Sequence, residues 1–505
     1  MTAESPPEPT KCAVGGNYFL FLELEGAKDI GIDPDGLLRG PSEAGLDQKS
    51  NNQVVQGTSR YLNISIIIIQ SITANSAMKT PNGIGGKLSL SGSAQDDLPD
   101  TNKSEFLHIF DSRTSKAYNV PVSDGFVRGS DLSAITAPVA GNEEHLQRLA
   151  VLDPGYQHTA CKESSITLIS SDGEKGELRY RGVSIETLFR EQDFDTTLYL
   201  LIWGHLPTTE EKAAFEDQLA KAATPPQLVR DVVRNLPRDM DFVSMQLIAV
   251  SAYITADKEM SRSRYQPALT YHQNMKTTDD AITRCIAYIA TSIALCYCHI
   301  KGVPFHEPQH GLTFVENFLR MIGMADPDKT VSRTIDRLWI LVADHELSCS
   351  TAAFLHTASA MTDPMTSLIS GIAAGSGPLH AGAIEICYQG LETLGTVDMV
   401  PAYLAAVKAK QFRLFGYGHR VYKTKDPRAT LIEELMEEHR DLVNANPLLQ
   451  VAMEIDRQAN TDPYFVERKL KLNADFYACF IYIALLMEYP RKWLWDCRPS
   501  PERVD

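Results

Sequence analysis

The sequence predicts a mainly α-helical protein with more than one domain. Apolar residues recur at helical spacing from Val183 onward, and capping residues and Gly-Pro breaks separate these runs. We find no fixed-period repeat and no alternation of parallel strands with helices. At 505 residues the chain is long enough for more than one domain and a large hydrophobic core.

An irregular extension and two hairpins precede the helical part of the chain. Residues 1–104 are rich in Gly, Ser, Asn, Pro and Asp and include the run GGKLSLSGSAQDD, which predicts that this extension is disordered. Residues 106–122, FLHIFDSRTSKAYNVPV, alternate apolar and polar positions around a polar turn, as a β-hairpin does. Residues 165–182 repeat the pattern and place Asp172-Gly173 at the turn.

Helix signals are clearest in three later segments. Thr208 or Thr209 can cap a helix whose first turn contains Glu210 and Glu211. Residues 281–302 are apolar on most faces, which predicts a buried helix. Residues 430–443, TLIEELMEEHRDLV, are amphipathic at helical spacing and predict a further helix.

Composition excludes several classes of partner. A net charge of −16 argues against nucleic acid, because binding to its phosphates needs a basic face. No segment reaches the roughly 18–20 continuous apolar residues of a membrane span. Nine cysteines without a framework indicate free thiols in a reducing compartment. The N-terminus is a poor transit peptide and the chain ends PERVD, so we expect a cytoplasmic location.

A basic segment stands out in this acidic chain. Residues 415–429 read FGYGHRVYKTKDPRA, and Arg413 lies just before them. The one acidic residue in this stretch is Asp426. The basic residues are Arg413, Arg420, Lys423, Lys425 and Arg428. Such a segment is either a salt-bridged surface or a site for small anions.

Three histidines and one aspartate are candidates for catalysis. His345 lies in ADHELSCST, His380 in GSGPLHAGA and His419 in GYGHR. A lone histidine in a helical protein is more often a satisfied core residue, but flanking glycines let a ligand approach the backbone. Asp475 precedes an apolar and aromatic run, so burial would raise its proton affinity towards that of a general base. The alternative for Asp475 is a helix N-cap.

The segment HEPQH, residues 306–310, matches the zinc motif H-E-x-x-H. That motif requires a helix, and Pro308 pushes Glu307 out of the helical region and removes a helical hydrogen bond. Cys296, Cys298 and His299 lie just before it, but CYCH is one residue short of the haem-attachment pattern. We therefore expect no metal site.

Taken together, these motifs resemble the citrate synthase family from about Phe106 to about Tyr489. The motifs that carry the resemblance are FDSRTSKAYNVPV, LDPGYQHTACKESSITLI, GELRYRGVSIETLF, LTFVENFLRM, ADHELSCST, SGPLHAGA and GYGHRVYKTKDPRA, in the family's order. The resemblance implies a large helical domain over 105–381, with 488–505 as a shortened remnant of its end, and a small domain over 382–487. It also implies a homodimer.

The resemblance further implies that an acyl-CoA and oxaloacetate are the substrates and that no cofactor or metal is used. Asp475 would take a proton from the acyl α-carbon, and His380 would hydrogen-bond the enolate oxygen. His419 would polarise the oxaloacetate carbonyl, and His345 and Arg428 would hold its other oxygens. The residues implied at CoA are Leu379, Arg413, Leu414, Gly416, Tyr417, Lys423, Lys469, Lys471 and Asn473. CoA phosphates and oxaloacetate would thus account for the basic segment.

The chain departs from the family pattern at several positions. Ala381-Gly382 stands where relatives have Gly-Gly, Lys471-Leu472 where they have Tyr-Pro, and Leu355 where many have arginine. After IYIALLMEYP the chain ends RKWLWDCRPSPERVD, and two family arginines that bind oxaloacetate, one from each subunit, do not map onto it. These departures leave an alternative, an inactive or weakly active homologue with a binding or assembly role.

Overall fold

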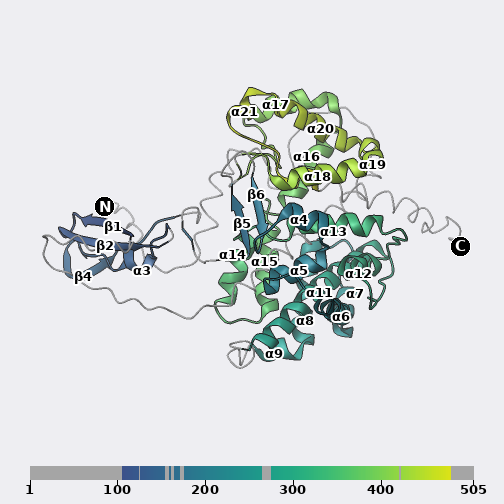
Figure 1. Cartoon of the computed structure of the whole chain (residues 1–505), viewed down its shortest axis with the longest axis horizontal. Coiled ribbons are helices and arrows are strands. Elements are labelled where there is room, and N and C mark those ends of the chain that lie inside the picture. Colours follow the sequence, from purple (N-terminus) through teal and green to yellow (C-terminus); the bar gives the residue numbers. More distant parts are fainter. Residues whose placement is uncertain are drawn as a thin grey trace, which may run out of the picture. The chain divides into compact units, whose positions relative to one another are not determined.

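The computed structural model describes residues 105–123, 125–153, 159–160, 164–170, 176–263, 274–419, 422 and 424–478 (Figure 1). The expected extension 1–104 and the expected remnant 488–505 lie outside these ranges. The chain divides into two compact units, one of residues 80–163 and one of residues 1–79 and 164–505. This boundary falls inside the range 105–381 assigned above to a large domain, and the assigned boundary at 381/382 stays a prediction.

The unit of residues 80–163 is built from two hairpins and a short helix. Strand β1 (Glu105–Asp111) pairs antiparallel with β2 (Lys116–Val122), which confirms the hairpin predicted over residues 106–122. Helix α3 (Gly129–Ser133) leads into β3 (Thr136–Val139), which pairs antiparallel with β4 (Asn142–Arg148).

The first described element of the other unit is a three-stranded antiparallel sheet. Its strands, β5 (Thr167–Ser170), β6 (Glu177–Tyr180) and β7 (Val183–Ser184), lie in chain order. Pairing of β5 with β6 confirms the second predicted hairpin. The predicted turn at Asp172-Gly173 lies outside the described residues.

Helices make up most of the remaining described residues of this unit, which confirms the mainly α fold class. The first series is α4 (Ile185–Glu191), α5 (Phe194–Trp203), α6 (Thr209–Ala222), α7 (Gln227–Arg234), α8 (Phe242–Ala256), α9 (Lys258–Ser263), α11 (Met275–Lys301), α12 (Phe314–Met321), α13 (Thr330–Val342), α14 (Cys349–Ala358) and α15 (Pro364–Gly375). The second is α16 (Ala383–Leu394), the 3-10 helix η1 (Val397–Met399), α17 (Val400–Lys408), α18 (Pro427–Glu438), α19 (Arg440–Ala445), α20 (Pro447–Ala459) and α21 (Pro463–Glu467). A further helical run covers residues 474–478.

Local sequence signals set several helix ends. Thr208 caps α6 and forms a capping box with Glu211, so Thr208 is the N-cap of the two candidates. The predicted buried helix is α11, which ends at Gly302 with a φ of 69°. By length and composition α11 could cross a membrane, but 83% of its most apolar window lies buried in the protein.

The helix predicted over 430–443 is instead two helices. Helix α18 begins earlier, at Pro427, and ends at Glu438, and α19 starts at Arg440. His439 between them has φ −110° and ψ 32°, and its Nε2 atom hydrogen-bonds Thr334 Oγ1 of α13 at 2.8 Å. This tertiary contact coincides with a break that helical periodicity alone does not reveal.

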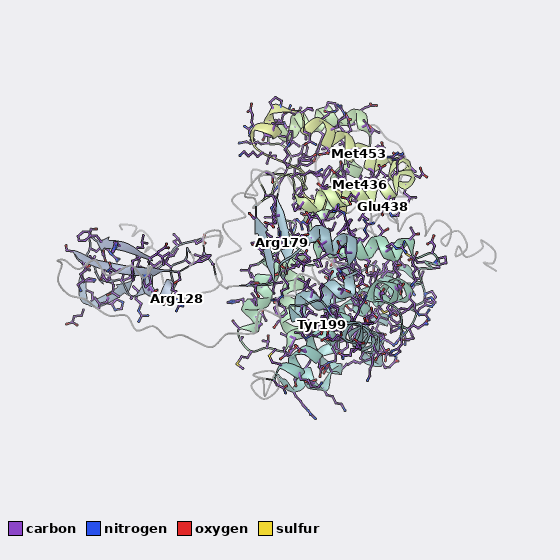
Figure 2. All side chains as sticks on the ribbon, viewed as in Figure 1. Arg128, Arg179, Tyr199, Met436, Glu438 and Met453 are labelled. Carbon is purple, nitrogen blue, oxygen red and sulfur yellow. The ribbon has the colours of Figure 1, made fainter. Side chains whose placement is uncertain are left out.

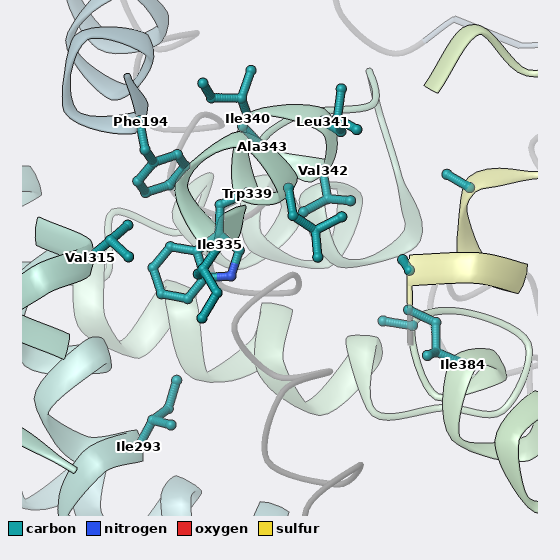
Figure 3. Close-up of a cluster of buried hydrophobic side chains, with 14 of the residues drawn as sticks. Phe194, Ile293, Val315, Ile335, Trp339, Ile340, Leu341, Val342, Ala343 and Ile384 are labelled. Carbon is teal, nitrogen blue, oxygen red and sulfur yellow. The ribbon is translucent and has the colours of Figure 1, made fainter. Parts of the chain in front are cut away.

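The hydrophobic core of the helical unit centres on Trp339 of α13. Figure 3 shows Trp339 with Phe194 and Ile335 around it. The Trp339 ring meets Phe194 edge-on at 5.3 Å between centroids and Phe318 at 5.4 Å. These contacts join α5, α12 and α13 into a rigid support for the elements that follow.

Helix α18 is docked onto this support by charged pairs. Arg337 of α13 binds Glu438 at 2.6 Å, and its guanidinium lies over the Phe189 ring at 4.2 Å. Arg190 of α4 pairs with Glu434 of α18. Glu438 is labelled on α18 in Figure 2. The C-terminal half of α18 is thereby held against α4 and α13, and Arg428 lies at the other end of the same helix.

Asp336 makes the stability of the core depend on pH. Its carboxylate accepts a hydrogen bond from Phe194 N at 3.0 Å. Burial, and then the charge of Asp193, raises the pKa of Asp336 to about 7. The folded chain therefore holds this proton more tightly than the unfolded chain, whose aspartates titrate near about 4. The free energy of unfolding must fall as pH rises between these values, by up to about 1.4 kcal/mol per pH unit.

We expect the variant D336N to lose less thermal stability than the wild-type chain between about pH 5 and pH 8. Asparagine cannot ionise, yet its Oδ1 can still accept the Phe194 N–H. Calorimetric melting temperatures across this range would measure the difference, with the exposed Asp239→Asn as the control. Equal losses for D336N and wild type would contradict the assignment.

Candidate active site

Main-chain hydrogen bonds join two of the predicted site segments. Gly418 N donates to Lys471 O at 2.7 Å, and Asn473 N donates to Gly416 O at 3.0 Å. The Asn473 side chain adds a bond from Nδ2 to Gly418 O at 3.1 Å. This ladder places the GYGH turn directly beside the segment that leads to the predicted general base.

Only glycine fits the position where the turn meets that segment. Gly416 has a φ of 78°, and a Cβ there would lie 2.8 Å from atoms of Phe476, which is fully buried. Gly418 has a φ of 85°. Between them, Tyr417 forms an antiparallel bridge with Leu472. The two glycines thus let the turn approach the backbone that carries Asp475.

Asp475 lies in the helical run 474–478 but does not cap it. Asn473 Oδ1 accepts the hydrogen bond from Asp475 N at 3.0 Å, so Asn473 is the capping residue. Burial raises the pKa of the Asp475 carboxyl, Arg428 opposes the rise and Asp426 adds to it. A carboxylate in such surroundings is a stronger base than an exposed one.

His419 and His345 pack against each other and against Tyr422. The two imidazole centroids are 5.0 Å apart, and the His419 ring lies 4.6 Å from that of Tyr422. Tyr422 N donates to His419 Nδ1 at 3.0 Å. Because Nδ1 is the acceptor, the proton of the neutral imidazole must be on Nε2.

His345 has a buried nitrogen with no partner in the described part of the chain. That atom is Nε2. Burial, followed by the charges of Arg428 and His419, holds the pKa of His345 well below the ordinary value. His345 is therefore neutral, and a buried unpaired ring nitrogen is a site for a hydrogen-bonding ligand.

Arg428 lies at the start of α18 and is 6% exposed. Its Nε and Nη2 atoms donate to the two carboxylate oxygens of Asp426 at 3.0 and 2.7 Å. The fork of Arg428, which is the pair of donors Nε and Nη2 that could bind a carboxylate with two hydrogen bonds, is thus occupied by Asp426 in this structure. Nη1 makes no recorded hydrogen bond to a described residue and is the edge of the guanidinium left for a ligand.

His380 follows α15 and is oriented by the start of α14. Its Nε2 accepts from Ser350 N at 3.3 Å and bonds Ser350 Oγ at 3.0 Å. An accepting Nε2 puts the proton of the neutral ring on Nδ1, and burial lowers the pKa of His380. Gly382 beyond it is obligatory, because a Cβ there would lie 2.7 Å from Gly377 O.

Ser350 was not among the residues singled out from the sequence. It shares the motif ADHELSCST with His345, which was a usable signal, but the motif does not reveal that Ser350 reaches His380, 30 residues away in the chain.

The residues implied at CoA fall into two groups. Gly416, Tyr417, Lys471 and Asn473 belong to the ladder, and the Tyr417 hydroxyl bonds Asp456. The others are Leu379, exposed beside His380; Leu414, buried; Arg413, exposed with its guanidinium 5.3 Å from the Phe415 ring; and Lys469, exposed. Lys423 lies outside the described residues.

The HEPQH segment is not helical in the structure. It runs between α11 and α12, and Glu307 binds Arg230 at 2.7 Å while His310 Nδ1 bonds Asp217 at 2.6 Å. The two histidines of the zinc motif therefore do not share one face of a helix, because Pro308 disfavours a helix through this segment. Over the ranges that the structure describes, no group of three or more His, Cys, Asp and Glu residues is arranged to hold a metal.

Comparisons with known proteins agree on one family. A family model described as the C-terminal domain of citrate synthase matches residues 155–490. A citrate synthase-like protein of Cochliobolus lunatus is 70% identical over 381 residues, 75% of this chain and 90% of that protein. An alkylcitrate synthase of a fungal species (strain ATCC 74256) is 35% identical over 390 residues, 75% of this chain and 84% of that protein.

A solved structure is also similar. It is the ternary complex of carboxymethyl coenzyme A and oxaloacetate with citrate synthase from Thermoplasma acidophilum, with 27% identity and a TM-score of 0.59. The match covers 66% of this chain and 85% of that one.

We expect Gly416→Ala to destabilise the chain by about 2–4 kcal/mol, because a left-handed conformation and overlap with Phe476 add together. Gly311→Ala is the matched control, since its φ of 79° equals that of Gly416 within a degree and nothing lies within 4 Å of its Cβ. It should cost only about 1 kcal/mol. Urea unfolding of both variants measures the difference, and equal costs would show that the Phe476 contact is unimportant.

Proposed function

The chain belongs to the citrate synthase family, and we propose that Asp475, His380 and His419 carry out its condensation of an acyl-CoA with oxaloacetate. The observation that carries the proposal is the position of Asp475. This carboxylate has a raised pKa and follows directly on a segment that is hydrogen-bonded to the turn bearing His419. A base and a carbonyl-polarising group are thus provided by two adjacent segments.

The first step of the proposed mechanism forms an enol(ate). Asp475 takes a proton from the α-carbon of the thioester, and the electron pair moves onto the thioester oxygen. The Nδ1–H of His380 would donate a hydrogen bond to that oxygen, which is consistent with an Nε2 that accepts from Ser350. Base and hydrogen-bond donor must act together, because a thioester α-proton is too weakly acidic for an unaided carboxylate.

The second step forms the carbon–carbon bond. The enol(ate) carbon attacks the ketone of oxaloacetate, which the Nε2–H of His419 would polarise. His345 Nε2 and Arg428 Nη1 would hold the oxygens of the dianion. His345 Nε2 is buried without a partner among the described residues, and the charge of Arg428 lies near enough to lower the pKa of His345. Hydrolysis of the resulting thioester then releases CoA.

We further propose a small domain over residues 382–487 that meets a large domain at this cluster, and a homodimer as the assembly. CoA would lie along the ladder formed by Gly416, Tyr417, Lys471 and Asn473, with the basic side chains nearby receiving its phosphates. The proposed chemistry needs only these side chains and the substrates. Independence of metals and cofactors, absence of membrane and nucleic-acid partners, and a cytoplasmic location stay predictions.

Release of CoA thiol by the purified chain tests the proposal. Oxaloacetate is supplied with acetyl-, propionyl-, hexanoyl- and octanoyl-CoA in parallel, so the assay also identifies the preferred acyl chain. We expect release that depends on oxaloacetate and falls by about 10²–10⁴-fold in Asp475→Ala, the range for loss of a general base. No release with any donor from folded protein would instead favour a homologue with a binding or assembly role.

Ser350→Ala tests the assignment of His380. The substitution keeps the backbone N–H of residue 350, which donates to His380 Nε2, but removes the hydrogen bond between Ser350 Oγ and His380 Nε2. We therefore expect kcat to fall roughly 10-fold, as for one lost hydrogen bond. Ser292→Ala is the control, because Ser292 is equally buried and its hydroxyl donates to Ile289 O within its own helix. Unchanged kcat in Ser350→Ala would show that this hydroxyl does not orient His380.

A further inference from the structure

Asp426 is a buried carboxylate that joins two segments of the site. It is 1% exposed and precedes Pro427 at the N-cap of α18. Its oxygens accept from Arg428 N, Nε and Nη2 at 3.0, 3.0 and 2.7 Å, and from Ala474 N at 3.3 Å. Ala474 begins the helical run that contains Asp475. One side chain therefore contacts both the arginine and the backbone next to the base.

Helix capping does not account for this arrangement. Among the described helices, two others begin with a capping Asp-Pro, α15 at Asp363 and α21 at Asp462. Asp363 accepts from Thr366 N and Oγ1, and Asp462 accepts from Tyr464 N and also binds Lys408 Nζ of α17 at 2.6 Å. Each of them caps its helix, and neither accepts a backbone hydrogen bond from a distant segment of the described chain. Asp426 additionally reaches a backbone N–H that lies 48 residues further along the chain.

The Asp426–Arg428 ion pair also sets the electrostatic environment of Asp475. A buried ion costs several kcal/mol of desolvation unless a partner compensates it, and here each ion is the partner of the other. While Asp426 is ionised, its negative charge offsets part of the attraction between Arg428 and the Asp475 carboxylate. If the Asp426 charge were removed, Arg428 would attract that carboxylate without this offset, and the repulsion between the two carboxylates would be lost.

The charged and titratable groups that interact with this pair include Asp475, His345, Tyr422 and Tyr180. Arg428 and Asp426 act on Asp475, and Arg428 and His345 act on Asp426. Tyr422 interacts with both members of the pair, and its own pKa is raised by burial. Both charges that act on the Asp475 carboxylate thus belong to one ion pair, so a change at Asp426 alters both influences in the same direction.

We propose that Asp426 is a positioning residue for the condensation, which holds Arg428 and the start of the Asp475 helix in register and keeps Asp475 a strong base. The inference rests on the proposed function, because it assigns Asp475 as the base. Asp426 itself need not touch substrate. It acts through the arginine that it orients and through the charge that it places beside Asp475.

The variant Asp426→Asn tests the proposal through the pH dependence of kcat. Asparagine is nearly the same size but carries no charge. Loss of the Asp426 charge removes a repulsion and leaves the positive charge of Arg428 uncompensated, and both changes favour ionised Asp475, so the acidic limb of the profile should move to lower pH by about one unit or more. The plateau value of kcat should fall about 10-fold or more, because a weaker base removes the α-proton more slowly. A folded variant whose acidic limb coincides with that of the wild type would overturn the proposal.

Two matched variants separate this effect from the loss of a helix cap. Asp363→Asn and Asp462→Asn make the same substitution at the same kind of Asp-Pro cap, and both should leave the acidic limb in place. A shift of similar size in either one would overturn the proposal, since capping would then explain the result. Melting temperatures of all three variants report the cost of the cap itself.

If Asp426→Asn does not fold, Asp426→Glu replaces it. Glutamate keeps the charge but adds a methylene group, so we expect an unmoved acidic limb with a kcat reduced about 10-fold by displaced Arg428 and Asp475. A glutamate variant with wild-type kcat and KM for oxaloacetate would overturn the positioning role.

A titration of the carboxyl groups by NMR distinguishes failure of this inference from failure of the proposed function. In chain labelled with ¹³C at aspartate Cγ, the signal that Asp475→Asn removes belongs to Asp475. That signal should titrate at lower pH in Asp426→Asn than in the wild type, whether or not the chain releases CoA. An inactive wild type would then refute the function, and an unmoved signal would refute the inference.

Discussion

The buried ion pair between Asp426 and Arg428 is the interaction on which the site depends. It lies at the N-terminus of α18, where it is 1% and 6% exposed, and its carboxylate also bonds the backbone at Ala474. Ion pairs on the opposite end of α18 hold that helix against α4 and α13. The hydrophobic core around Trp339 is therefore connected to the cluster of site residues through one helix and one carboxylate.

A second constraint is the close approach of the GYGH turn to the segment before Asp475. The approach is possible only because Gly416 has no side chain where Phe476 packs. Main-chain hydrogen bonds then set the register of the ladder, and the Asn473 side chain fixes the start of the Asp475 helix. At Lys471 the bond to Gly418 N is accepted by the main-chain carbonyl, so it does not depend on the lysine side chain.

The neutral histidines follow from burial rather than from sequence context. His345 and His380 both have lowered pKa values because desolvation disfavours their charged forms. In each neutral ring the proton is on the nitrogen that does not accept a hydrogen bond. His380 Nε2 and His419 Nδ1 are the acceptors, so the protons are on His380 Nδ1 and His419 Nε2. Neutral donors at fixed points can stabilise negative charge that develops on oxygen, and burial favours the neutral forms of His345 and His380.

The sequence by itself determined the family, the mainly α fold, both hairpins, a helix cap at Thr208 or Thr209 and the set of candidate residues, because these depend on local patterns and on motifs read in order. It did not reveal that Ser350 contacts His380, that His439 separates α18 from α19, or that Asp426 occupies the fork of Arg428. Only the tertiary structure decided these points. Each is a contact across about 30 to 105 residues of chain, or a pairing that exists only once burial removes water as the competing partner.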